Sequence, residues 1–164
     1  MKEIIVHSKK HGNKIALVDD EDFKILNKFK WRLQIGKNTC YACRTYPTGP
    51  LILSISMHRQ IYGLSYGQKK VIDHINHNGL DNRKENIRVC TYAENAQNKT
   101  INNKGSSKFK GVHWSKQQQK WAASIGLNNK TYSLGFFEKE EDAALKYNRV
   151  AAKHHKEYAN LNIL

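Results

Sequence analysis

Cysteine is scarce in this chain of 164 residues, which has three: Cys40, Cys43 and Cys90. Cys40 and Cys43 form a C-x-x-C, but no second cysteine pair completes a four-ligand zinc site. Residues three apart in an extended segment also point to opposite faces. We therefore expect three reduced cysteines lying in strands, and neither a disulfide framework nor a structural zinc site.

Long apolar runs are also absent. The first ten residues, MKEIIVHSKK, hold an apolar run of only three, which is too short for the apolar core of a signal peptide. No run elsewhere approaches the roughly 20 residues that cross a membrane as a helix. We expect a cytoplasmic protein with no membrane partner.

Acidic residues are few, since 14 of them stand against 28 lysines and arginines, a formal net charge of +14. From Asn95 to Phe137 there is no acid at all, although the window holds seven lysines: Lys99, Lys104, Lys108, Lys110, Lys116, Lys120 and Lys130. A solvated face normally mixes both signs. A generally basic surface would explain the total charge, but the acid-free window favours a nucleic-acid partner.

The first segment, residues 1–64, predicts a β-rich layer. Short apolar runs with turn residues between them predict strands at NKIALVDD, KWRLQI, CYACRTY and LILSIS. EDFKILNKF has helical spacing through Phe23, Leu26 and Phe29, and MHRQIYGL reads as a short helix. His58 and Arg59 in that short helix contact DNA, brace a neighbouring site, or simply hold a helix position; the pattern leaves all three open.

The last segment, residues 109–164, predicts three strands and a helix. FKGVHW, KWAASIG and TYSLGFF are the strands, and a helix follows from near Glu138. Tyr132, Leu134 and Phe136 are expected on one face of the third strand. Residues 100–108, TINNKGSSK, are polar and read as a linker that also lies along DNA. The tryptophans are expected in the sheet core.

The stretch VIDHINHNGLDNRKENIRVCTYAENAQNK, residues 71–99, carries the chemistry. Hydrolysis of a phosphodiester needs a base that takes a proton from water near neutral pH, and a hard cation that stabilises the departing oxygen. Histidine suits the first task. Carboxylate and amide oxygens suit Mg²⁺ or Mn²⁺. His74 is therefore a candidate base, with Asp73 and Asn95 as candidate metal ligands.

Local sequence signals bring these three residues together. VIDHIN predicts a short strand that ends in Asp73 and His74, HNGLDN a turn, and NIRVC a second strand. Thr91 and Glu94 in TYAE form a capping box, which starts a helix with Asn95 in its first turn. Two strands and a helix would thus place the base and both ligands in one region.

These residues, with Asn86 twelve positions after His74 and Asn95 nine later, resemble the HNH endonuclease family and its ββα-metal motif. The run VIDHIN…LDNRKENIRVCTYAENAQN is similar to free-standing and intron-encoded homing endonucleases of phages and bacteria. The resemblance implies that His74 activates water and that Asp73 and Asn95 hold one divalent metal ion. It implies that Asn86 holds the hairpin loop and orients His74.

The final segment resembles an Apetala-two/ethylene-response-factor DNA-binding domain, through KGVHW, KWAASI, YSLGFF, EEDAALKYNRVAAKHH and YANLN in that order. The plant domain presents arginines from its sheet, where this chain offers Lys110, His113, Lys116 and Lys120. Lysine reads guanine less well than arginine does. We expect these residues, with Lys99, Lys104, Lys108, Lys130 and Arg59, to contact DNA.

The sequence thus predicts an α+β protein. Residues 1–99 form a β-rich region and an HNH nuclease domain (core about 70–99), 100–108 a basic linker, and 109–164 a three-stranded antiparallel sheet packed on one helix. The predicted function is a homing-type, site-specific endonuclease for double-stranded DNA that uses Mg²⁺ or Mn²⁺. Because a linker joins two binding surfaces, we expect a monomer on an asymmetric site in the cytoplasm of a bacterial or phage-infected cell. A non-catalytic DNA-binding regulator is the alternative, and an RNA-binding protein is disfavoured.

Overall fold

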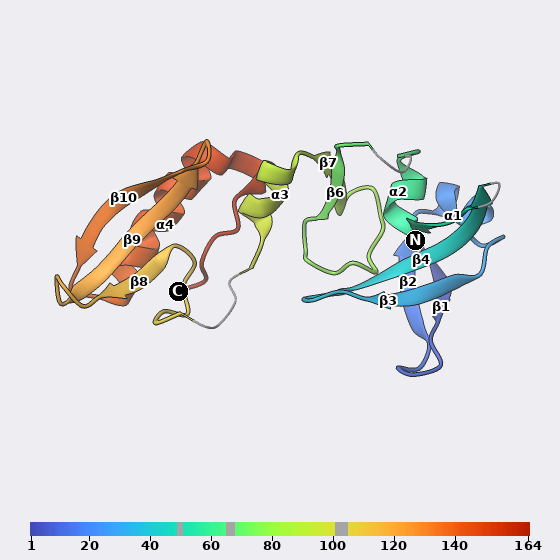
Figure 1. Ribbon diagram of the computed structural model, residues 1–164, viewed down its shortest axis with the longest axis horizontal. Coiled ribbons are helices and arrows are strands. Elements are labelled where there is room, and N and C mark those ends of the chain that lie inside the picture. Colours follow the sequence, from blue (N-terminus) through green and yellow to red (C-terminus); the bar gives the residue numbers. More distant parts are fainter. Residues whose placement is uncertain (49–50, 65–67, 101–104) are drawn as a thin grey trace. The chain divides into compact units, whose positions relative to one another are not determined.

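The fold is mixed α+β, as predicted, in a computed structural model that describes residues 1–48, 51–64, 68–100 and 105–164 (Figure 1). The chain divides into two compact units, Met1–Asn95 and Ala96–Leu164. The division falls within helix α3, Tyr92–Asn98. Each unit has its own sheet and its own hydrophobic core.

A five-stranded sheet forms most of the first unit. Its strands are β1 (Lys2–His7), β2 (Lys14–Val18), β3 (Trp31–Ile35), β4 (Cys40–Thr48) and β5 (Leu51–Ser56), in the order β2-β1-β3-β4-β5. Neighbours pair antiparallel except β1 and β3, which are parallel. The four strands predicted from the sequence are confirmed. Strand β1 was not predicted, although it lies inside the sheet.

The core of this unit lies between the sheet and two short helices, α1 (Asp20–Leu26) and α2 (Met57–Ile61). Trp31 is fully buried, as expected, and its Nε1–H donates to the carbonyl of Leu26 at 2.9 Å. Phe29, expected on the helix, follows its end instead and is 37% exposed. Both helices predicted here are confirmed, with α1 shorter than its apolar spacing indicated.

A second hairpin follows, made of β6 (Val71–His74) and β7 (Ile87–Cys90), and α3 comes directly after it. The long loop between β6 and β7 is attached to the edge strand β2. The amide of Leu17 donates to Leu80 O, and the amide of Asn82 donates to Leu17 O, both at 2.8 Å. The five-stranded sheet is therefore a scaffold for the hairpin loop.

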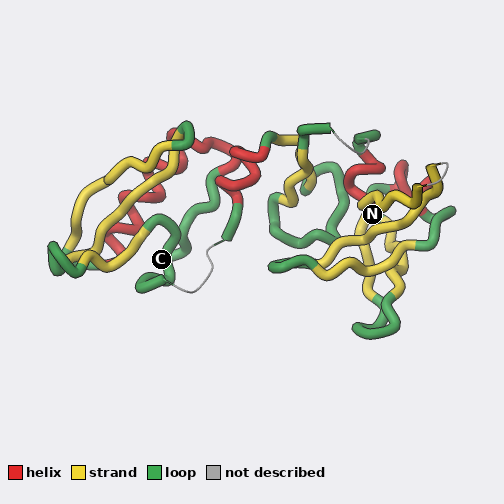
Figure 2. Tube along the Cα trace, in the orientation of Figure 1, coloured by secondary structure: helices red, strands yellow, loops and turns green. Residues whose placement is uncertain are grey.

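The second unit is an antiparallel sheet in the order β10-β9-β8, with helix α4 packed on it (Figure 2). The strands are β8 (Val112–Ser115), β9 (Lys120–Leu127) and β10 (Lys130–Phe137); α4 spans Glu140–His155, and a 3-10 turn covers Lys156–Tyr158. Ala143, Ala144 and Ala151 on α4 are fully buried. Small side chains let the helix approach the sheet closely.

Gly111 explains why β8 begins later than FKGVHW predicted. Its φ is +75°, and a Cβ there would lie 2.1 Å from the ring of Tyr147. Its carbonyl accepts the amide of Ser124 at 2.8 Å. Only glycine fits this close approach, so residues 109–111 form a turn that tucks under the helix. Helix α4 starts at Glu140, two residues after Glu138, near which it was predicted to begin.

The predicted face of β10 is wrong, because the strand carries a bulge. Pairing with β9 shifts between Ser133 and Gly135, whose φ is +116°. A bulge inserts one residue and reverses the alternation after it. Leu134 and Phe137 consequently pack on the core, whereas Phe136 is 50% exposed.

All three cysteines are free thiols in strands, as expected. Residues 101–104 of the expected linker lie outside the described residues. Further along it, Ser107 is buried, and its hydroxyl donates to Glu140 Oε1 at 2.6 Å. The end of that segment is part of the folded second unit.

Candidate active site

His74, the proposed base, ends strand β6 and is 6% exposed. Burial lowers the pKa of its imidazole, against the opposing effects of the Asn82 amide and of Asp73 and Asp81. Its Nε2 lies 3.3 Å from Asn82 Oδ1. Burial therefore favours the neutral imidazole, and Asn82 holds its Nε2.

The orientation of the Asn82 amide decides which nitrogen of His74 carries the proton. Asn82 is fully buried, and its Nδ2 donates to Leu80 O at 3.2 Å and to Met57 Sδ at 3.5 Å. Its Oδ1 therefore faces His74. Because an amide oxygen only accepts, His74 Nε2 must carry the hydrogen. The unprotonated nitrogen of the ring is then Nδ1.

Asp73 occupies the neighbouring position on β6 and points to the opposite face of the strand. Its carboxylate is 6% exposed and pairs with Arg88 on β7, whose Nε and Nη2 donate to Oδ2 at 3.0 and 2.7 Å. The register pairs these two residues directly across the hairpin. A buried carboxylate next to His74 in the strand is thus held in an ion pair with Arg88.

The capping box that was predicted for α3 is confirmed. Glu94 N donates to Thr91 Oγ1 at 3.2 Å, and Glu94 Oε2 accepts Thr91 N–H at 2.7 Å. These bonds hold the pKa of Glu94 below its usual range. The capping box sets Asn95 in the first turn of the helix, where the backbone N–H of Asn95 donates to Thr91 O at 3.0 Å.

The thiol of Cys90 lies close to both candidate ligands, Asp73 and Asn95. Burial raises the pKa of this thiol to about 11, with further contributions from the charges of Asp73 and Glu94. The backbone N–H of Asn95 donates to it and acts the other way. The charge of Asp73 therefore acts on the Cys90 thiol, and the backbone of Asn95 bonds to it.

Asn86 holds the loop of the hairpin. It is buried, its Nδ2 donates to Asp81 O at 2.8 Å, and its Oδ1 accepts the amide of Asn76 at 3.0 Å. The His74 ring bonds to Asn82, whose Oδ1 accepts from Nε2. Sequence reasoning missed Asn82 because it stands among six asparagines of the motif, and turn formation explained it equally well.

The residue types around Asp73 and Asn95 fit a small hard cation. In the described parts of the chain, no three His, Cys, Asp or Glu side chains gather as a metal site. One carboxylate and one amide oxygen, completed by water, form the kind of partial oxygen site that Mg²⁺ accepts. Burial raises the pKa values of the Cys43 and Cys90 thiols to about 11. These thiols are therefore poor metal ligands, because a cysteine binds a metal ion as the thiolate.

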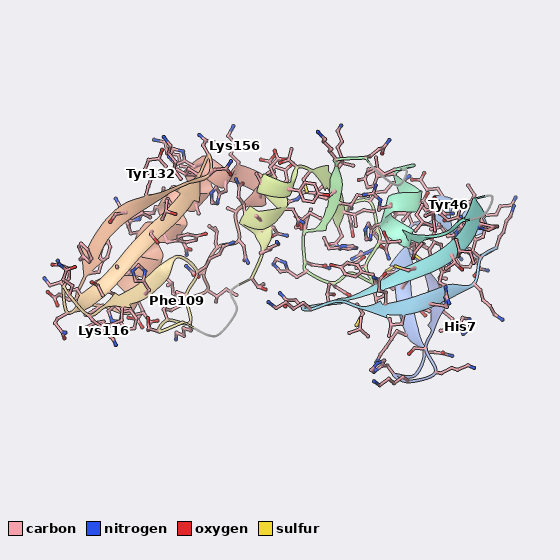
Figure 3. The ribbon with its side chains drawn as sticks, viewed as in Figure 1. His7, Tyr46, Phe109, Lys116, Tyr132 and Lys156 are labelled. Atoms are coloured by element: carbon pink, nitrogen blue, oxygen red, sulfur yellow. The ribbon has the colours of Figure 1, made fainter. Side chains whose placement is uncertain are left out.

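The residues predicted to contact DNA differ in their exposure and in their bonds to other protein groups. Five are exposed: Lys99, Lys108, His113, Lys116 and Lys130. Lys116 projects at the β8–β9 turn (Figure 3). Lys120 pairs with Glu138 at 2.8 Å, and Arg59 Nη1 donates to Lys70 O at 3.1 Å. Lys104 lies outside the described residues.

Lys110 differs from these. Its ammonium donates to the carbonyls of Gln97 and Lys99 at the end of α3. Burial lowers the pKa of Lys110 to about 8. The side chain therefore satisfies helix carbonyls that would otherwise lack a donor, which leaves it poorly disposed to contact a phosphate.

Among the described residues, no helix is both long and apolar enough to cross a membrane.

Residues 56–97, which cover α2, the β6–β7 hairpin and most of α3, match the family model for HNH endonuclease. Protein 3.8 of Escherichia phage T7 is 30% identical over 63 residues, 38% of this chain and 52% of that protein.

A longer match extends beyond the motif. The chain is 32% identical over 151 residues to an uncharacterized HNH endonuclease of Acanthamoeba polyphaga mimivirus, which covers 90% of this chain and 74% of the relative. The similarity therefore includes both compact units as well as the hairpin and helix that carry Asp73, His74 and Asn95. On this match and that of the motif, the chain belongs to the HNH endonuclease family.

Proposed function

We propose that this protein is a homing-type, site-specific endonuclease for double-stranded DNA, with His74 as general base and one divalent metal ion, Mg²⁺ or Mn²⁺. The observation that carries the proposal is the fixed, buried imidazole of His74 next to the carboxylate of Asp73, which pairs with Arg88. A protein that only binds DNA has no need of this arrangement.

The proposed proton transfer starts at Nδ1 of His74. Its pKa is lowered by burial, so the ring is neutral near pH 7 and Nδ1 can take a proton from the attacking water. Asn82 Oδ1 retains the hydrogen on Nε2 and stabilises the imidazolium that forms. The water oxygen attacks phosphorus, and the bond from phosphorus to the 3′ oxygen breaks.

Asp73 and Asn95 would hold the metal ion through their side-chain oxygens. The ion, when bound, supplies charge that stabilises the scissile phosphate and the departing oxygen. Arg88 orients the Asp73 carboxylate through an ion pair, and the Thr91–Glu94 cap fixes the helix turn that carries Asn95. Asn86 maintains the loop that presents Asn82.

The second unit would hold the target DNA in the manner of an Apetala-two/ethylene-response-factor domain. What supports this is a three-stranded antiparallel sheet packed on α4, with exposed His113, Lys116 and Lys130. Two binding units in one chain suit a monomer on an asymmetric site. Relatives from a virus and a phage favour the cytoplasm of an infected or bacterial cell as its location.

The test is to select targets and then cut them. Random-sequence duplexes are first selected for binding to His74→Ala, and the selected DNA is then given to the unaltered chain with Mg²⁺, Mn²⁺ or EDTA. We expect metal-dependent cleavage at a fixed position, with kcat lower by about 10²- to 10⁴-fold in His74→Ala. Selected DNA that is bound but stays uncut with either metal would support the non-catalytic regulator.

A further inference from the structure

Three aromatic rings from three elements of the first unit meet at the candidate base. The ring of His58 on α2 lies 5.0 Å from that of His74, centroid to centroid, with an interplanar angle of 86°. Tyr41 on β4 lies 5.7 Å from His58 and 5.9 Å from His74. The contact of His58 with His74 is edge-to-face, whereas that of Tyr41 with His74 is tilted at 51°. Edge-to-face contacts have a preferred geometry, so the His58 ring restricts rotation of the His74 ring.

His58 is an unusual residue to find in this position. It is 9% exposed, its Nε2 lies 2.9 Å from Ser56 Oγ, and its buried Nδ1 has no hydrogen-bond partner among the described residues. A buried polar atom without a partner is costly, and such an exception in a folded protein calls for an explanation.

We propose that His58 is a positioning residue for His74: its neutral ring packs edge-to-face against the imidazole of His74 and keeps Nε2 of that imidazole on Asn82. The proposal rests on the proposed function, because the atom that is positioned, His74 Nδ1, is the one that would take the proton from water. In this role His58 acts through His74 and needs no contact of its own with DNA or the attacking water.

The charge state of His58 fits this role. Burial, followed by the proximity of His74 and Arg59, lowers the pKa of His58 to about 3. A charged His58 would oppose the arrival of a proton on His74, whereas a neutral ring does not. Asp73 and Asp81, the acids that act on His74, favour its protonation.

Two substitutions and a core control test the proposal. His58→Ala removes the ring, His58→Phe keeps a ring without nitrogens, and Leu26→Ala weakens the same core away from the site. For each we would measure kcat and KM on the selected DNA, unfolding by urea, and the imidazole ¹⁵N shifts of His74, which report its tautomer without any DNA or metal.

We expect His58→Ala to lower kcat by about 10-fold or more, to leave KM within about 2-fold because binding is untouched, and to convert His74 from one Nε2–H tautomer into a mixture. His58→Phe should recover most of kcat and the single tautomer. Leu26→Ala should lose stability and keep the kcat of its folded fraction.

The proposal is overturned if His58→Ala keeps kcat and the single tautomer, or loses activity only as far as Leu26→Ala does. If His58→Ala does not fold, a folded His58→Phe that shows a mixed tautomer overturns it as well. Failure of the unaltered chain to cut DNA would instead reject the proposed function, and the tautomer measurement would still decide the role of His58.

Discussion

At the scale of single residues, the site depends on an asparagine whose two amide atoms are both engaged. Asn82 bonds Leu80 and Met57 through Nδ2 and His74 through Oδ1. The loop backbone fixes the orientation of the Asn82 amide, and this amide determines which nitrogen of His74 carries the hydrogen. The resemblance to the HNH family gave the orienting role to Asn86. In this chain the side chain of Asn86 bonds to backbone atoms of the same loop.

Replacement of Asn82 by alanine should therefore disable His74, the proposed base, while leaving the proposed metal ligands in place. We expect kcat to fall by about 10- to 100-fold, because His74 loses the acceptor that holds the hydrogen on Nε2. Binding of Mn²⁺, followed by electron paramagnetic resonance, should be unchanged. Arg83→Ala on the same loop is the control, and an equal fall in kcat for both variants would contradict the prediction.

His58 also makes the stability of the first unit depend on pH. Its pKa is about 3 in the folded chain and about 6.5 when unfolded, so between these values the unfolded state binds a proton that the folded state does not. The stabilisation is complete above the unfolded pKa and is lost as pH falls towards the folded one, by roughly 1.4 kcal/mol per pH unit.

Urea unfolding at several pH values between about 4 and 7 checks this expectation. His58→Phe should show a shallower dependence of the free energy of unfolding on pH. The dependence should not vanish, because burial also lowers the pKa of His74. An unchanged slope in the variant would show that His58 is protonated in the folded chain.

At the scale of elements, the short helix α3 is held at both ends by side chains. Thr91 and Glu94 cap its first turn, and Lys110 bonds the carbonyls of Gln97 and Lys99 at its last. Its seven residues are too few to be stable through helix propensity alone. The position of Asn95 therefore depends on the Thr91–Glu94 cap.

Thr91→Ala should lower the free energy of unfolding by about 1 kcal/mol, since it removes the side-chain acceptor of the helix N-cap. It should also weaken Mn²⁺ binding, because Asn95 shares the turn that loosens. Calorimetric titration of Mn²⁺ measures the second effect, with Thr91→Ser, which keeps the hydroxyl, as the control. Weaker binding in Thr91→Ser than in Thr91→Ala would contradict the explanation.

The elements that could be predicted from the sequence are those whose signals are local. Alternating apolar residues predicted β2 to β5, and the Thr91–Glu94 spacing predicted the start of α3. Strand β1 was missed because only Ile4 and Val6 of it reach the core. The face of β10 was wrong because a bulge at Gly135 depends on pairing with β9, which the sequence of one strand does not contain.

At the scale of the whole molecule, the net charge of +14 favours binding to DNA, but a lysine contributes only where it is free to meet a phosphate. Lys116 is exposed at the β8–β9 turn, whereas the ammonium of Lys110 is bound to backbone carbonyls. The same residue type therefore serves two purposes within the second unit, and the sequence alone did not separate them.

The salt dependence of DNA binding should distinguish the two lysines. Lys116→Ala is expected to reduce the slope of log affinity against log salt by about one, and Lys110→Met should leave this slope unchanged while altering stability. Fluorescence anisotropy of a labelled duplex over a series of salt concentrations provides the measurement. A reduced slope for Lys110→Met would place its ammonium on the DNA.

The attachment of the hairpin loop to Leu17 has a consequence for solubility. An edge strand with unpaired backbone groups is a template on which another chain can add, and β2 is such an edge. Leu80 and Asn82 occupy the N–H and C=O of Leu17, so the loop that orients the base also shields the sheet from aggregation. Variants that release this loop should lose activity and form oligomers together.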